Sequence, residues 1–73
     1  MITKKQATKA FNLLSANYMH EMWCIGMFVC YNESVGYYIL LHVLEDSTVD
    51  YYTIIPNSVG NVPILFEKVT VSA

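Results

Sequence analysis

Apolar side chains recur at steps of three and four residues over the first eighteen positions, which is the spacing of an amphipathic helix. The apolar stripe consists of Ala7, Ala10, Phe11, Leu14 and Tyr18. Thr3 and Gln6 have the spacing of a capping box, in which the threonine hydroxyl accepts from a backbone N–H group and the glutamine reaches back. The pattern therefore predicts a helix that begins after Thr3 and ends near Tyr18.

Strand-forming residues (Val, Ile, Tyr, Phe, Trp and Thr) dominate the rest of the chain. The expected strands are 22–31, 37–44, 49–55 and 64–71, with turns at 32–36, 45–48 and 56–61. Connections this short suit antiparallel neighbours. We predict a single α+β domain over residues 1–73, with one N-terminal helix packed on a four-stranded antiparallel meander sheet, in the order α-β-β-β-β. Glu67 and Lys68 in the last strand are typical of a sheet edge.

The first two strands lack the alternation of apolar and polar residues that a sheet with one wet face shows. In the first strand one face would carry Trp23, Ile25, Met27 and Val29, and the other would carry Met22, Cys24, Phe28 and Cys30. One helix can cover only one of these faces. We expect the other face to be covered by a second copy of the chain, in a homodimer, or by another protein. A sheet that curls strongly enough to cover itself is the alternative.

Composition supports association. Hydrophobic residues make up 55% of the 73 residues and charged residues only 14%. A domain of this size has a high ratio of surface to volume, so it cannot bury that much apolar surface within itself. Oligomerisation is one of the ways in which small domains gain stability.

The charge pattern argues against two classes of partner. The net charge is −2, the chain has no arginine, and every formal charge between residues 10 and 66 is negative. Proteins bind phosphate backbones with dense patches of lysine and arginine, so we expect no nucleic-acid partner. The uncharged run 22–32 is shorter than the roughly 20 residues of a membrane-spanning helix, and Glu33 follows it. We therefore expect no membrane partner and a cytoplasmic location.

Two histidines and two cysteines raise the question of a zinc site: His20, Cys24, Cys30 and His42. Five residues separate Cys24 from Cys30, and on one straight strand the two would lie about 20 Å apart. That separation excludes both a shared metal ion and a disulfide. We expect no metal and no cofactor, and we interpret the cysteines as small buried hydrophobic residues.

A thiol–imidazole pair is the sharper catalytic hypothesis. A turn over residues 32–36 would place Tyr31 opposite Tyr37 and Gly26 opposite His42. Cys24 would then be a diagonal neighbour of His42 on the same face, at about 5–7 Å. The sequence offers no residue that obviously orients His42 and no glycine-rich oxyanion loop, so we do not expect an enzyme.

Aromatic and acidic residues supply the candidate binding surface. The tyrosine pairs 37–38 and 51–52 would lie on both faces of adjacent strands. Tyrosine is enriched at interfaces because it has an apolar body and a polar tip. The acidic segment 46–50 lacks the glycine and the glutamate that a calcium loop needs, so we expect a solvated turn that can meet a basic partner surface. The predicted binding residues are Trp23, Tyr37, Tyr38, Tyr51, Tyr52, Asp46 and Asp50.

The leading hypothesis is a small non-enzymatic protein-interaction module that self-associates and binds or occludes a partner protein. By analogy, an inhibitor or accessory factor encoded by a phage or mobile element would fit this description. Two alternatives stay open: a small-ligand-binding domain, and a thiol enzyme that uses Cys24 and His42. The ligand pocket would lie between helix and sheet, lined by Phe11, Leu14, Trp23, Phe28 and His42.

Overall fold

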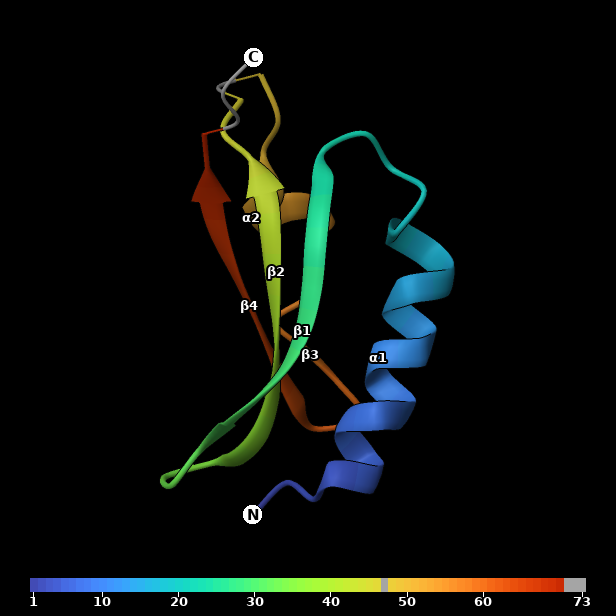
Figure 1. Ribbon diagram of the computed structural model, residues 1–73, viewed down its shortest axis with the longest axis vertical. Coiled ribbons are helices and arrows are strands. Elements are labelled where there is room, and N and C mark those ends of the chain that lie inside the picture. Colours follow the sequence, from blue (N-terminus) through green and yellow to red (C-terminus); the bar gives the residue numbers. More distant parts are fainter. Residues whose placement is uncertain (47, 71–73) are drawn as a thin grey trace.

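The computed structural model describes residues 1–46 and 48–70, and it begins with the expected helix (Figure 1). Helix α1 runs over Lys4–Tyr18. The backbone N–H of Gln6 donates to the Thr3 hydroxyl at 3.2 Å, and the backbone N–H of Thr3 donates to the Gln6 side chain at 2.8 Å. The predicted capping box is therefore confirmed. It satisfies a backbone N–H group of the first turn, which has no partner within the helix.

Strands β1 (Cys24–Asn32) and β2 (Gly36–Leu44) form an antiparallel hairpin. Tyr31 lies opposite Tyr37 and Gly26 opposite His42, so the register predicted from the turn is confirmed for this part of the hairpin.

The sheet is mixed, so the predicted antiparallel meander is wrong. Strand β4 (Val62–Val69) pairs parallel with β2, and the two-residue strand β3 (Ser58–Val59) pairs antiparallel with β4. The strand order is β1-β2-β4-β3, within an α+β fold that keeps the expected N-terminal helix and four strands. A parallel pair needs a crossover connection, which residues 45–61 supply. Ser47 and Val71, predicted in the second turn and the last strand, lie outside the described residues.

The segment predicted as the third strand contains a short helix instead, α2 (Tyr51–Ile54). Tyr51 is fully buried, its ring packs against Trp23 and Phe66, and its hydroxyl donates to the carbonyl of Leu44. The strand preference of a residue mostly reflects how well its side chain packs in a sheet. Burial of this tyrosine against the core therefore outweighs the strand preference of the segment.

Both helices pack on the same face of the sheet, and the hydrophobic core lies between them and the strands. Figure 1 shows α1 running alongside the strands. From β2 the core takes every second residue, because successive side chains of a strand point to opposite faces. These core residues are Ile39, Leu41 and Val43, all fully buried. The β2 residues between them point away from the helices.

Candidate functional site

The face of the sheet opposite the helices is apolar and exposed. Residues that lie opposite one another on neighbouring strands share a face, so the strand register defines its members. Phe28 on β1 and Leu65 on β4 are exposed, and Leu40 on β2 is half-buried between them. We call this surface the open face; its residues are Phe28, Cys30, Tyr38, Leu40, His42, Leu44, Leu65, Glu67 and Val69.

Two polar side chains of the open face, His42 and Glu67, lie side by side in one row across the strands, and Gly26 of β1 completes this row. The ring of Phe28 lies over Gly26, so close that a Cβ atom at Gly26 would lie 3.0 Å from a carbon of the ring. The same ring meets His42 edge-on, with 4.9 Å between the ring centroids. His42 Nε2 lies 3.8 Å from Glu67 Oε2. The histidine is thus held between an aromatic ring and a carboxylate, in the middle of an apolar surface.

The predicted neighbourhood of Cys24 and His42 is wrong, because β1 has an irregularity at Ile25. The pairing shifts by one residue there, so Cys24 lies opposite Val43 and faces the helices. Its thiol lies 4.0 Å from the sulfur of Met19, and burial raises the pKa of Cys24. A higher pKa leaves less of the reactive thiolate at neutral pH. The two groups of the hypothetical thiol–imidazole pair therefore lie on opposite faces of the sheet.

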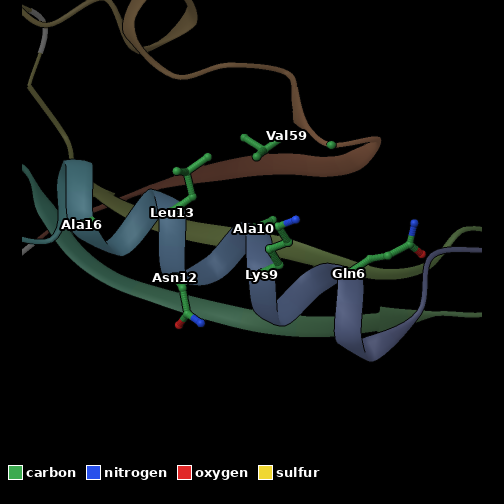
Figure 2. A pocket seen from close by; sticks show the side chains of 8 residues that line it. Gln6, Lys9, Ala10, Asn12, Leu13, Ala16 and Val59 are labelled. Carbon is green, nitrogen blue, oxygen red and sulfur yellow. The ribbon is translucent and has the colours of Figure 1, made fainter.

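The five residues of the predicted ligand pocket are also divided between the two faces. Phe11, Leu14 and Trp23 belong to the core side, whereas Phe28 and His42 lie on the open face. A different hollow of about 750 Å³ lies between α1 and the turn that joins β3 to β4 (Figure 2). Its lining residues are Gln6, Lys9, Ala10, Asn12, Leu13, Ala16, Val59 and Gly60.

The predicted aromatic binding residues are scattered rather than gathered. Tyr38 lies on the open face, whereas Tyr37 lies on the helix side of β2 and packs edge-on against Tyr31, at 5.1 Å between centroids. Tyr51 and Tyr52 lie on α2, so their predicted placement on a strand is wrong. Tyr51 is buried, and Tyr52 is exposed.

Trp23 precedes β1 and is half-buried between two tyrosine rings. Its ring centroid lies 5.7 Å from that of Tyr18 and 5.5 Å from that of Tyr51. These contacts join α1, the start of β1 and α2 on the core side. The tryptophan thus helps to hold the two helices against the sheet.

The predicted acidic binding residues stabilise the crossover connection. Asp46 accepts from the backbone N–H of Thr48 at 2.9 Å and from its hydroxyl at 2.7 Å. These two hydrogen bonds, the hydroxyl first, lower the pKa of Asp46. Asp50 accepts from the hydroxyl of Thr53 at 2.7 Å, at the start of α2. Asp46 therefore holds the local backbone, whereas the carboxylate of Asp50 bonds a side chain and makes no hydrogen bond to the backbone at the start of α2.

The sequence indicated part of the open face and missed the rest. The predicted hairpin register brings Phe28, Leu40 and His42 to one face, so this half could be found from the parity of the positions. Leu65 and Glu67 join them only through the parallel pairing of β4 with β2, which short connections did not suggest.

Residues 1–46 and 48–70 contain no cluster of three or more His, Cys, Asp or Glu side chains that could hold a metal ion. In the same part of the chain, neither helix has the length and hydropathy of a membrane-spanning segment. No protein-family model, curated protein or solved structure matches the sequence or the fold.

Proposed function

We propose that this chain is a non-enzymatic protein-interaction module that self-associates through the open face, as a homodimer, and binds or occludes a partner protein. The observation that carries the proposal is an exposed apolar surface that extends over β1, β2 and β4. Apolar surface gains free energy when it leaves water, and exposed apolar patches commonly mark interaction sites.

A second copy suits this face because the face is almost free of charge. Glu67 is the only Asp, Glu, Lys or Arg residue of the open face, and it lies beside His42. Two such faces can pack as the sheets of a β-sandwich do, about 10 Å apart, with apolar side chains interdigitating. In this arrangement Phe28, Leu40 and Leu65 would form the centre of the contact.

The partner-binding part of the proposal rests on the surface that such a dimer leaves free. Tyr52 is exposed on α2, where one side of its ring meets Phe66 edge-on, and Asp50 is exposed beside α2. A tyrosine beside a carboxylate suits a partner surface with apolar and basic groups. The role of an inhibitor or accessory factor, of the kind that phages and mobile elements encode, agrees with the small size and the lack of arginine.

A matched pair of variants tests the self-association surface. Leu65 on the open face and Leu13 on α1 are both 53% exposed, so a lysine at either position disturbs the monomer to a similar degree. Burying a whole leucine side chain is worth about 1.5–3 kcal/mol, so covering the exposed half of Leu65 is worth about 1 kcal/mol per copy. A dimer would lose about 2 kcal/mol, which raises its dissociation constant about 30-fold.

Light scattering after size-exclusion chromatography, over a series of protein concentrations, gives the masses. We expect Leu65→Lys to dissociate at much higher concentrations than the wild type, and Leu13→Lys to associate as the wild type does. Leu13 lines the hollow along α1. Loss of association in Leu13→Lys alone would therefore place the interface at that hollow and contradict the proposal.

A further inference from the structure

Strand β1 is an edge strand, and beyond the irregularity at Ile25 its regular part, residues 26–32, has no feature that blocks pairing. It lies at the end of the sheet order, and none of the described residues pairs with its outer side. Its sequence, CIGMFVCYN, contains no charged residue and no proline. Natural proteins usually protect such edges with charges, prolines, bulges or very short strands, because an unprotected edge pairs with other chains.

The opposite edge of the sheet is protected. Strand β3 pairs with β4 only at Ser58 and Val59. Farther along, the exposed part of β4 carries Glu67 and Lys68. The two edges therefore differ in the property that controls strand pairing, and the charges are placed on β4 alone.

Apolar side chains are exposed on both faces of β1. Phe28 belongs to the open face. Val29 and Tyr31 lie opposite Ile39 and Tyr37 on the helix side, yet both are exposed. A contact through the open face would cover Phe28 but leave Val29 and Tyr31 in water. A strand added beside β1 would contact side chains on both faces, since neighbouring strands lie only about 4.8 Å apart.

We propose that β1 is a second self-association surface, at which it pairs antiparallel with β1 of another copy across a two-fold axis. An extended chain that pairs with β1 can replace the water on the outer backbone N–H and C=O groups with a row of strand hydrogen bonds. A two-fold axis brings each strand against itself, so any charge on β1 would meet its equivalent or a near neighbour. The absence of charge along all of β1 removes that repulsion.

This inference rests on the proposed self-association and adds a second interface to it. The two surfaces are distinct. The open face consists of side chains that point away from the helices, whereas the β1 edge consists of backbone N–H and C=O groups that point outward in the plane of the sheet. Edge pairing joins two sheets into one continuous sheet, and the open faces of two such units can then pack together. The full assembly would be a tetramer with both kinds of two-fold contact.

A second matched pair of variants tests the edge. Val29 on β1 and Val35 in the hairpin turn are 39% and 41% exposed. We therefore expect lysine at either position to lower the stability of the monomer by a similar amount. Lysine is a common blocker of edge strands, and like charges opposed across a strand pair are destabilising. We expect Val29→Lys to weaken the edge contact about tenfold or more and Val35→Lys to leave it unchanged. Tyr31→Lys provides a second blocking variant if Val29→Lys fails to fold.

Two measurements on the full chain distinguish the surfaces. By sedimentation, the wild type should reach a tetramer, Val29→Lys and Leu65→Lys should each stop at a dimer, and the double variant should be a monomer. By hydrogen–deuterium exchange, alternate amides of β1 should become protected as the wild-type concentration rises, and they should stay unprotected in Val29→Lys.

The possible failures are separable. Amides of β1 that exchange freely at every wild-type concentration would overturn the edge inference. If Leu65→Lys still dissociates in that case, the open-face proposal stands. If Val29→Lys becomes monomeric while Leu65→Lys associates as the wild type does, the edge inference stands and the open-face proposal is wrong.

Discussion

Gly36, at the start of β2, occupies a position where the backbone leaves no room for a side chain. Its φ angle is +88°, and a Cβ atom there would overlap the backbone oxygen of Ile2 and lie 2.8 Å from its nitrogen. Ile2 forms a bridge beside Gly36, in which its N–H donates to Val35 at 3.0 Å and its carbonyl accepts from Tyr37 at 3.1 Å. Gly36→Ala must therefore displace the N-terminal residues from the hairpin.

Gly60 provides the matched control for Gly36. It also has a positive φ angle, +52°, but no atom lies within 4 Å of the position that a Cβ would take. Alanine in the left-handed region costs about 1–2 kcal/mol at either site. Gly36→Ala additionally breaks the two hydrogen bonds of Ile2, and each of them is worth about 0.5–1.5 kcal/mol. The expected extra loss in the free energy of unfolding is therefore about 2 kcal/mol.

Thermal unfolding followed by circular dichroism, at one fixed protein concentration, measures this difference. For a domain of this size, 1 kcal/mol shifts the melting temperature by about 4–8 °C, so Gly36→Ala should melt roughly 8–16 °C below Gly60→Ala. Equal melting temperatures for the two variants would refute the claim that the approach of Ile2, rather than the φ angle, makes glycine necessary.

Two further predictions concern titratable groups. Thr48→Val removes the hydroxyl that lowers the pKa of Asp46, so that pKa should rise towards its ordinary value in an NMR titration, and an unchanged pKa would contradict this cause. Because folding lowers this pKa, the contribution of Asp46 to stability is present above the ordinary pKa of aspartate and is lost as the pH falls through the folded-state pKa. Burial raises the pKa of Cys24, so its thiol should be alkylated more slowly in the folded chain than in denaturant at neutral pH, whereas faster alkylation when folded would indicate an activated thiol. Cys24→Ser should retain the mass of the wild-type assembly.

Local sequence signals predicted the first half of the fold well. The capping box at Thr3 and Gln6 and the apolar stripe that follows it act within one or two helical turns, so they could be recognised without knowledge of the rest. The hairpin register followed from the turn, since its length determines which residues lie opposite one another. Both predictions depended on residues close together in the sequence.

The errors came from contacts between distant residues. The irregularity at Ile25 reverses the face of Cys24, and its one local signal, a glycine inside the strand at Gly26, was not interpreted as a bulge. Tyr51 adopts a helical turn because its ring enters the core between Trp23 and Phe66, which are distant in the sequence. That turn is part of the crossover that makes β4 parallel to β2 and brings Leu65 to the open face. The sequence therefore did not predict the β4 half of the open face, because that half depends on the contact of Tyr51 with Trp23 and Phe66.

The central claim is that the chain associates with itself through surfaces that its own fold leaves uncovered. Sedimentation equilibrium of the purified wild-type protein, from low to high micromolar concentration, tests it most directly. The monomer mass is 8.3 kDa. We predict an average mass that rises with concentration to at least twice that of the monomer. A mass that stays at the monomer value through the high micromolar range would contradict the account.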